Sequence, residues 1–324
     1  MIKANKAQFL YESRGIAGIS SLNFEIKPNE IISIMGPSGA GKTTLLNLIT
    51  QKIKLSSGEI QIDTPKESIS YVRQFPTLDE EKSLFQNLIS LENQQYQNEM
   101  RDVLEQLELT NEIDLPVKAL SGGQKQRAII AKALVPLPKI LLLDEPFANI
   151  HDFLKFDLLN FLIPKLKEMR VTTLWVTHQI KDALAFSDKI MLMNFGKIVQ
   201  FDTPEEVYKK PNGLFPGNFL GSINAWTLSK TENFENSFLE QSFKVPFEKT
   251  RYETFCLIRP EYIEPKNQGL RVKEIISFYY GTFWENHGLL ENGEQIIFNS
   301  NEKQDKESFV SVNWNKAHFL DGIS

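Results

Sequence analysis

The segment Gly36-Pro37-Ser38-Gly39-Ala40-Gly41-Lys42-Thr43 decides the fold of this 324-residue chain. It fits the phosphate-loop pattern G-x-x-x-x-G-K-[ST], and it lies between an apolar run over 30–35, read as a buried strand, and a helical pattern over 43–49. The glycines let the backbone wrap a phosphate chain, and the N-terminus of the helix adds its positive end. A surface glycine turn needs neither the Lys42-Thr43 pair nor these flanking elements. The sequence therefore predicts a phosphate-binding loop.

Charged and hydroxyl side chains near this loop predict a metal and a hydrolytic base. Lys42 can reach the β- and γ-phosphates, and Thr43 can ligate Mg²⁺. The apolar run over 140–143 ends in Asp144 and Glu145, and ligands in such sheets bind outside the carboxyl ends of the strands. We expect Asp144 to hold the coordination shell of Mg²⁺. We expect Glu145 to act as the hydrolytic base on a water beyond the γ-phosphate. Without the loop, the two acids would read as solvated residues at the end of a strand.

A second glycine motif, Leu120-Ser121-Gly122-Gly123-Gln124, precedes a helical pattern over 125–134. Ser121 and Gln124 match the S-x-x-Q capping box, so one interpretation is a well-capped helix. That interpretation leaves two adjacent glycines unexplained, because glycine at a helix start costs stability. They are useful where a phosphate must approach backbone N–H groups closely. The chain thus has two phosphate-binding motifs but only one acid pair. This suggests that the two motifs of one chain bind different nucleotides across a dimer.

The order of elements predicts an α/β fold with a small β domain behind it. Strands and helices alternate through the first two thirds, which indicates a parallel sheet covered by helices. Helical spacing without strands over 79–109 indicates a helical subdomain, placed at about 76–135. A hairpin over 189–201 and a short helix from 203 are expected to close the first domain, 1–225. Short β-favouring runs then predict an all-β barrel over 226–324.

Composition limits the classes of function. The chain has 36 Lys and Arg against 41 Asp and Glu, a formal net charge of −5, so we expect no nucleic-acid partner. The single Cys256 permits no intramolecular disulfide, and the N-terminus lacks the apolar run of a signal peptide. Every apolar stretch is broken by charge, whereas a membrane span needs about 20 mostly apolar residues. The chain reads as cytosolic, with any membrane role exerted through partners.

The phosphate loop, the segment 120–124 and the segment 140–145, in this order, resemble the nucleotide-binding subunit of ABC transporters. The resemblance covers about 9–220, and 120–124 resembles the signature of that family. It implies a P-loop ATPase that works with ATP and Mg²⁺. It also implies a head-to-tail homodimer in which each ATP lies between the phosphate loop of one subunit and the signature of the other.

The resemblance also implies roles for single residues. Gln74 matches the glutamine that senses Mg²⁺ and the permease, and His178 matches the switch histidine that contacts the γ-phosphate. Tyr11 is the candidate for stacking on adenine. Without the family, these three would read as a surface glutamine, a strand-end histidine and a core tyrosine. The implied ATP contacts are Tyr11, Gly36, Ser38, Gly39, Ala40, Gly41, Lys42, Thr43, Thr44, Ser121, Gly122, Gly123 and Gln124; Thr43, Gln74 and Asp144 are implied at the metal, and Glu145, His178 and Gln74 in catalysis.

The chain departs from the family pattern after Glu145. The position that usually holds the aspartate coupling the two ATP sites is His151, with Asp152 one place later. This replacement bears on the turnover rate and on the cross-talk between sites, not on ATP binding. It keeps one alternative open, a nucleotide-gated regulatory or binding protein with weak hydrolysis.

The last third resembles the transport-associated OB-type domain of importer ATPases. Ile258-Arg259-Pro260-Glu261 matches a motif typical of the start of its barrel, and 314–319 is similar in outline to its ending. An aromatic cluster could bind a small regulator, but aromatic side chains dominate core packing, so we expect barrel core. The cluster comprises Phe278, Tyr279, Tyr280, Phe283 and Trp284.

Together these features predict the ATP-hydrolysing subunit of an ABC importer, peripheral at the cytoplasmic face of the membrane. The implied partners are transmembrane permease subunits, a second copy of the chain and, indirectly, an external solute-binding protein. Exporter subunits usually lack the OB-type tail, and non-transport ABC proteins usually carry a second cassette or a long coiled coil. The solute class stays open among polyamines, iron, inorganic anions and sugars, because the permease and the binding protein select it.

Overall fold

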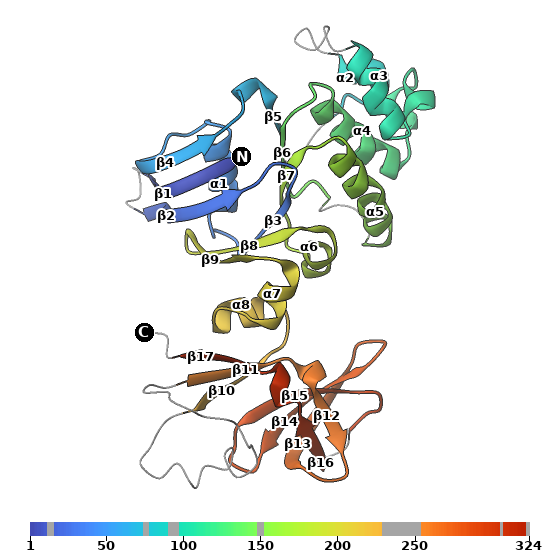
Figure 1. The fold of residues 1–324 in the computed structure, drawn as a ribbon. Helices are drawn as coiled ribbons and strands as arrows, with labels where there is room; N and C mark the ends of the chain where they lie inside the picture. The colour runs from blue at the N-terminus through green and yellow to red at the C-terminus, as the bar shows by residue number, and fades with distance from the viewer. Residues whose placement is uncertain are drawn as a thin grey trace. The chain divides into compact units, whose positions relative to one another are not determined.

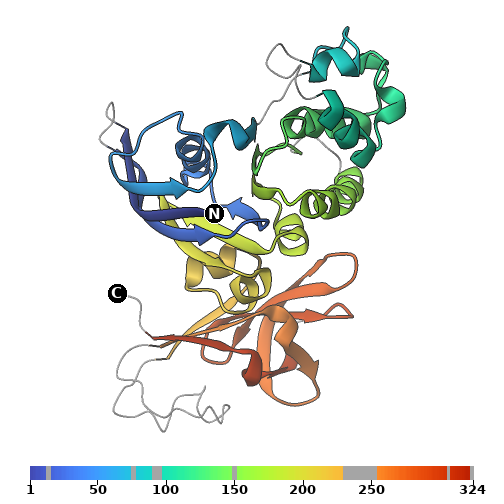
Figure 2. The same cartoon turned by 45° about the horizontal axis from the view of Figure 1, so that its top comes forward.

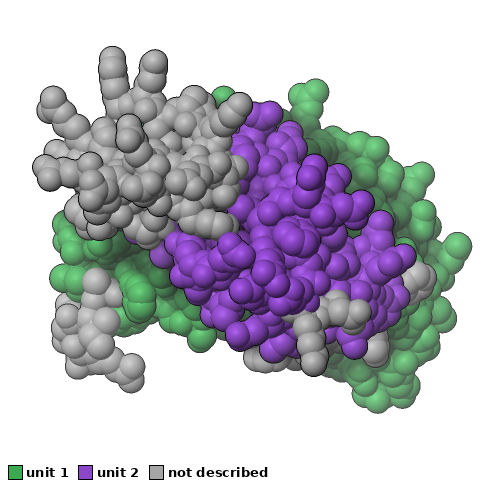
Figure 3. Space-filling model, turned by 90° about the horizontal axis from the view of Figure 1, so that it is seen from below, with its two compact units in different colours: residues 1–204 green, residues 205–324 purple. Residues whose placement is uncertain are grey.

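The structure is a computed structural model that describes residues 1–11, 16–73, 78–89, 97–147, 152–228, 254–304 and 307–321. The contacts divide the chain into an N-terminal unit, Met1–Pro204, and a C-terminal unit, Glu205–Ser324 (Figure 3). Among the described residues, no helix is long and apolar enough to cross a membrane.

A six-stranded sheet lies at the centre of the N-terminal unit, in the order β5-β6-β7-β3-β8-β9 (Figure 1). All neighbours are parallel except the last pair, β8 and β9, which form the predicted antiparallel hairpin. The predicted α/β parallel-sheet architecture is thus confirmed. The strands are β3 (Ile31–Met35), β5 (Ile69–Val72), β6 (Ile140–Asp144), β7 (Thr172–Val176), β8 (Lys189–Asn194) and β9 (Lys197–Asp202).

Helices cover both faces of this sheet and form the predicted helical region. Helix α1 (Lys42–Ile49) follows β3, as predicted. The helical region contains short α2 (Leu84–Leu88), α3 (Gln97–Gln106) and α4 (Gly122–Leu134), with no strand among its described elements (Figure 2). Helix α5 (Asp152–Glu168) lies between β6 and β7 in the chain, and α6 (Ile180–Phe186) follows β7.

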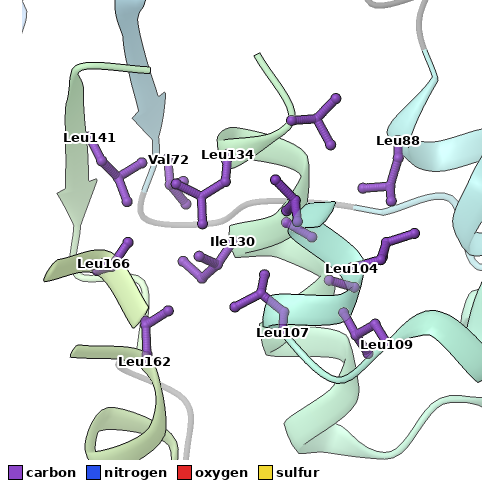
Figure 4. Close-up of a cluster of buried hydrophobic side chains, with 14 of the residues drawn as sticks. Val72, Leu88, Leu104, Leu107, Leu109, Ile130, Leu134, Leu141, Leu162 and Leu166 are labelled. Carbon is purple, nitrogen blue, oxygen red and sulfur yellow. The ribbon is translucent and has the colours of Figure 1, made fainter. Parts of the chain in front are cut away.

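Successive residues of the buried strands face opposite sides of the sheet, because side chains alternate along a strand. Leu142 of β6 packs in one cluster with α1, whereas its neighbour Leu141 packs in a second cluster. Figure 4 shows the second cluster, which contains Leu141 of β6 together with Ile130 and Leu134 of α4 and Leu162 of α5. The same cluster includes α3 residues, so the helical region shares its core with the sheet rather than forming a separate domain.

A second, antiparallel sheet was not anticipated from the sequence. It has the order β2-β1-β4, with β1 (Ile2–Tyr11), β2 (Ile16–Ile26) and β4 (Ser57–Ile62). Ile2 and Ala4 are buried while Lys3 between them is exposed, the alternation of a sheet with one solvated face. The buried face packs in the cluster that includes α1, and this arrangement brings Tyr11, at the end of β1, beside the phosphate-loop helix.

The C-terminal unit is all antiparallel in its sheets, which agrees with the predicted OB-like domain. One sheet has the order β12-β16-β13-β14-β15 and the other the order β10-β11-β17. The strands are β10 (Asn224–Leu228), β11 (Thr254–Ile258), β12 (Ile263–Lys266), β13 (Leu270–Tyr279), β14 (Trp284–Leu290), β15 (Gln295–Ser300), β16 (Glu307–Val312) and β17 (His318–Asp321). Two short helices precede them, α7 (Pro204–Lys209) and α8 (Leu214–Phe219).

The division between the units falls at 204/205, not at the expected 225/226. The physical reason is Arg259, which is buried directly after β11 and donates hydrogen bonds to carbonyl oxygens of the helical segment. Its guanidinium reaches Tyr208, Gly217, Gly221 and Ser222 at 2.8–3.1 Å, and it lies 4.2 Å from the Tyr208 ring centroid. The helix expected to close the first domain therefore packs with the second.

The aromatic cluster is not barrel core, so that expectation is wrong for its central members. Phe278, Tyr279 and Tyr280 are 47%, 63% and 61% exposed, and the β13–β14 hairpin places them on its surface. The core instead contains Trp226, Val272, Ile296, Phe298 and Val310. Tyr280 and Phe283 stack on one another, and Tyr279 packs on Trp284, so the rings cover each other across the hairpin.

We expect Arg259→Ala to destabilise the C-terminal unit by about 3 kcal/mol, because buried carbonyl oxygens lose their donor and a large side chain leaves a cavity. Urea unfolding of the full chain, followed by tryptophan fluorescence, measures this, since Trp226, Trp284 and Trp314 all belong to that unit. Arg271→Ala, which removes an exposed arginine paired with Glu307, is the control and should leave the midpoint nearly unchanged. Equal midpoints for the two variants would show that Arg259 does not hold the unit together.

Candidate nucleotide-binding site

The phosphate loop connects β3 to α1, and two of its glycines are required by close backbone approach. Gly36 has φ +150°, and a Cβ there would lie 2.1 Å from the Met193 carbonyl oxygen. Gly41 has φ +100°, and a Cβ there would lie 2.7 Å from the Gly18 carbonyl oxygen. The Gly196 N–H also donates to the Ala40 carbonyl at 3.1 Å. The β8–β9 hairpin and β2 therefore hold the loop in place, while Ser38 and Gly39 at its tip are exposed.

Lys42 is the first residue of α1, and its side chain folds back over the phosphate loop. Its Nζ donates to the carbonyl oxygens of Gly36 and Pro37 at 2.8 and 2.9 Å. Burial lowers the pKa of Lys42 from its ordinary value, and the nearby carboxylates of Glu145 and Asp144 oppose that shift. The ammonium group therefore lies close both to the loop and to the acids at the end of β6.

Asp144 and Thr43 meet at the carboxyl edge of the sheet. The Thr43 hydroxyl donates to Asp144 Oδ2 at 3.1 Å, and Asp144 is buried. Two neighbouring oxygen ligands of an octahedral Mg²⁺, at 2.0–2.1 Å from the ion, lie about 2.9 Å apart. The spacing of these two oxygens thus fits a Mg²⁺ site completed by phosphate and water. The described residues contain no group of three or more His, Cys, Asp or Glu side chains that could hold a metal ion.

Tyr71 is part of this arrangement, and the sequence analysis missed it. Its hydroxyl donates to Asp144 Oδ2 at 3.0 Å, and burial together with the Asp144 charge raises the pKa of Tyr71. Parallel pairing sets Tyr71 of β5 opposite Leu142 of β6, so its long side chain reaches the end of that strand. Only the strand order could have revealed this partner, because the two residues are 73 positions apart.

Glu145 and His178 stand at the ends of neighbouring strands. Glu145 has φ +50°, an uncommon conformation for a non-glycine residue and one that clusters at functional sites. Its N–H donates to the Val176 carbonyl at 3.2 Å, which links the turn after β6 to β7. Glu145 Oε2 lies 3.7 Å from His178 Nδ1, and the His178 side chain is half exposed. Both side chains are therefore held at the same edge as the phosphate loop.

Tyr11 also lies near the loop. Its hydroxyl is 2.9 Å from the Thr44 hydroxyl, and its ring packs edge-on against Phe9. Gly18 allows this, since a Cβ there would lie 2.6 Å from the Tyr11 ring. The ring is 43% exposed, so it is not the core tyrosine of the alternative interpretation.

The glycine motif starts α4 in the helical region. The Ser121 hydroxyl accepts from the Gln124 N–H at 3.2 Å, and the Gln124 side chain accepts from the Ser121 N–H at 2.9 Å, so the predicted capping box is present. A Cβ at Gly122 or Gly123 would meet nothing within 4 Å. The fold of one chain thus gives no steric reason for these glycines.

Two predicted positions lie outside the described residues. These are Gln74, which follows the last described residue after β5, and His151, which precedes α5. Their expected roles stay predictions, as does the role of Asp152. The structure brings together the other phosphate-loop, acid and histidine candidates at one sheet edge, whereas the Ser121–Gln124 motif starts α4 in the helical region.

Three features lie at one edge of the parallel sheet: a glycine loop between β3 and α1, an acid pair at the end of β6 and a histidine after β7. This combination defines a P-loop nucleotide-binding domain. Residues 19–148 match the ABC transporter family. The chain belongs to the ATP-binding subunits of ABC transporters, and it is an ATPase of that class, as predicted.

Relatives and solved structures agree with this assignment. The spermidine/putrescine import ATP-binding protein PotA of Mycoplasma capricolum is 32% identical, covering 95% of this chain and 93% of its own. The Fe(3+) ions import ATP-binding protein FbpC of Vibrio cholerae is 31% identical over 82% of each chain. The structure of cbiO1 from Clostridium perfringens, part of the ABC transporter complex cbiONQ, matches 64% of this chain and 89% of its own with TM-score 0.59 and 29% identity. The ATP-binding cassette MJ0796, solved as a dimer bound to ADP and Pi, matches 63% of this chain and 99% of its own with TM-score 0.53 and 27% identity.

Proposed function

We propose that this chain is the ATP-hydrolysing subunit of an ABC importer and that it acts at the cytoplasmic face of the membrane through a partner permease. The observation that carries the proposal is the length of the likeness to import subunits. PotA of Mycoplasma capricolum aligns with 95% of the chain, and so includes the β-rich C-terminal unit as well as the ATPase. The antiparallel C-terminal unit behind a single cassette also supports the proposal, because exporter subunits usually lack an OB-like tail.

The site residues have separate roles in this proposal. Backbone N–H groups of the loop 36–44 and the Lys42 ammonium bind the ATP phosphates. Thr43 and Asp144 hold Mg²⁺, which when bound neutralises phosphate charge, and Tyr71 orients the Asp144 carboxylate by its hydrogen bond. Tyr11 stacks on the adenine. Gln74 completes the metal environment and reports on the permease.

Glu145 and His178 carry out the hydrolytic step. Glu145 takes a proton from the attacking water, because its carboxylate directly follows the metal-binding acid and lies at the same sheet edge as the phosphate loop. His178 donates to the γ-phosphate, and the 3.7 Å separation of its Nδ1 from Glu145 Oε2 lets the two side chains act at one reacting centre. The products of this step are ADP and inorganic phosphate.

The signature motif is proposed to act on ATP bound by a second copy of the chain. Gly122 and Gly123 are open to their surroundings at the start of a 13-residue helix, where N–H groups and the helix dipole favour an anion. MJ0796, a structural neighbour, is a dimeric cassette. A head-to-tail homodimer would set this motif against the γ-phosphate held by the partner's loop.

We expect Gly123→Asp to abolish ATP-driven dimerisation and to lower the ATPase rate at least about 100-fold, because like charges meet at the γ-phosphate. Its thermal midpoint should not fall, since the added atoms meet nothing within 4 Å and an acid suits a helix N-terminus. ATP binding by the single chain should persist. Gly123→Ala is the matched control for size without charge, and equal losses in both variants would argue against an electrostatic effect on a bound phosphate.

The solute class proposed for the first test is the polyamines, because PotA relatives match nearly the whole chain. The likeness to FbpC makes Fe(3+) the second candidate. The chain should be purified with the membrane proteins that accompany it and reconstituted in liposomes. Spermidine uptake that depends on ATP and is lost with Lys42→Ala would support the proposal, and Fe(3+) uptake alone would replace the solute class. ATPase activity without uptake of any solute would count against an importer.

A further inference from the structure

A buried ion pair lies behind the proposed catalytic side chains. Lys155 Nζ of α5 is 2.8 Å from Asp182 Oδ2 of α6, and the two side chains are only 5% and 10% exposed. The other ion pairs between described residues of the N-terminal unit are more accessible; in the pair between Lys167 and Asp188, for example, the side chains are 47% and 34% exposed. A buried lysine charge is costly unless it is paired, so each member of the pair requires the other.

The two helices joined by this pair begin beside the catalytic turns. Helix α6 starts at Ile180, two residues after His178, and Asp182 belongs to its first turn. The Gln179 N–H donates to the Thr177 hydroxyl at 3.0 Å, so the turn that carries His178 leads directly into the helix. Helix α5 begins at Asp152, seven positions after Glu145, and Lys155 belongs to its first turn. A displacement of α6 against α5 would therefore reach the turn that carries His178.

Both members of the pair also line a small cavity with the two proposed catalytic residues. The cavity has a volume of about 40 Å³, and its wall includes Glu145, Phe147, Lys155, His178 and Asp182. Phe147 packs edge-on against Trp175 of β7 on the same side. The other lining residues belong to the turns after β6 and β7 and to the end of β7, so the ion pair is a polar contact that joins α5 to α6 beside both turns.

We propose that Lys155 and Asp182 are positioning residues for ATP hydrolysis, which hold His178 at its working distance from Glu145. The pair is not needed merely for stability, because replacing a buried ion pair by apolar residues of similar volume is often neutral or stabilising. Nucleotide affinity should be independent of it. The phosphate loop, Lys42 and Asp144 belong to β3, α1 and β6, and they are held by β2, β5 and the β8–β9 hairpin.

The test compares kcat, KM for ATP and thermal midpoint for variants of the full chain. Lys155→Met should lower kcat at least about tenfold and leave KM within about twofold, since a misplaced group affects the chemical step and not ground-state binding. Lys155→Arg, which can restore the ion pair, should recover most of the rate. A Lys155→Arg chain as slow as Lys155→Met would contradict the proposal.

A double variant separates positioning from stability. Lys155→Met with Asp182→Leu leaves no buried charge, so its thermal midpoint should return towards that of the parent, while kcat should stay low. Recovery of both midpoint and kcat would overturn the proposal. Lys189→Met is the matched control, because it breaks another ion pair of the same unit, 2.9 Å long, between Glu30 and the start of β8. It should keep the parental kcat.

This inference depends on the proposed roles of Glu145 and His178, so both are measured in the same assay. If Glu145→Gln and His178→Ala keep the parental rate, those roles are wrong. If they lose the rate and Lys155→Met keeps it, the positioning proposal alone fails.

Discussion

Lys42→Ala should bind ATP about 100-fold more weakly than the parent chain, because it loses charge-assisted hydrogen bonds worth roughly 3 kcal/mol in total. The Lys42 Nζ is the cation of the phosphate loop and bonds the carbonyls of Gly36 and Pro37 at 2.8 and 2.9 Å. The loop itself should survive the change. Its path is set by backbone approach to Met193, Gly18 and Gly196, none of which involves the lysine side chain.

The measurement is equilibrium binding of ATP in the presence of Mg²⁺, together with the ATPase rate. Lys54→Ala is the matched control, since it removes an exposed lysine a few residues after α1 and leaves the loop unchanged. Unaltered affinity in Lys42→Ala would show that residues 36–43 are not the phosphate site. A loss of affinity accompanied by unfolding would appear as a lowered thermal midpoint, which the retained backbone contacts lead us not to expect.

The sequence was sufficient for the parallel sheet because its strands are continuous apolar runs with chemistry at their ends. Ile31–Met35 and Ile140–Asp144 are buried along their whole length, and only buried parallel strands need such runs. Gly36 and Gly41 were identified as loop glycines from the motif pattern, and their positive φ and close backbone contacts explain why glycine is required there. The same local logic predicted the Ser121–Gln124 capping box.

The antiparallel parts were harder because their residues satisfy partners far away in the chain. β14 contains Glu285, Asn286 and Gly288, which disfavour a strand prediction. Yet Asn286 is fully buried, and its side-chain amide donates to Trp284 and Phe298 carbonyls and to the Ser300 hydroxyl. Gly288 leaves room for Val272, which a Cβ would approach to 2.4 Å. Neither the Asn286 hydrogen bonds nor the close approach at Gly288 can be inferred from the sequence without knowing which strands pair.

The candidate site shows the same division between local and distant information. The phosphate-loop, signature and acid-pair residues were found by their local patterns, and Gln74, His178 and Tyr11 by the resemblance to a family. Tyr71 and the Lys155–Asp182 pair have no motif. Their importance comes from contacts across strands and helices, such as the 3.0 Å bond from Tyr71 to Asp144. The exposed hairpin at Tyr279 and Tyr280 illustrates the opposite error, since residue type alone suggested burial.

Glu145→Gln should still bind ATP and Mg²⁺ but hydrolyse ATP at least about 100-fold more slowly, because a positioned general base typically contributes 10²–10⁴-fold. The amide keeps the shape of the side chain but cannot take a proton from water. The backbone of the turn should not move, since the N–H of residue 145 bonds the Val176 carbonyl and not a side chain. Thr43 and Asp144 hold their own contact at 3.1 Å, so the metal environment should also persist.

Because binding survives and turnover does not, Glu145→Gln should accumulate as an ATP-bound dimer, whereas the parent returns to monomer as it consumes ATP. Light scattering after size-exclusion chromatography, with ATP and Mg²⁺ in the buffer, measures the dimer, and phosphate release measures the rate. Glu168→Gln at the end of α5 makes the same chemical change at an exposed glutamate and should leave both readouts at parental values. Parental turnover in Glu145→Gln would exclude this residue as the base. Slow turnover without a dimer would keep the base and count against the proposed head-to-tail arrangement, in which ATP shared between two copies holds them together when hydrolysis stops.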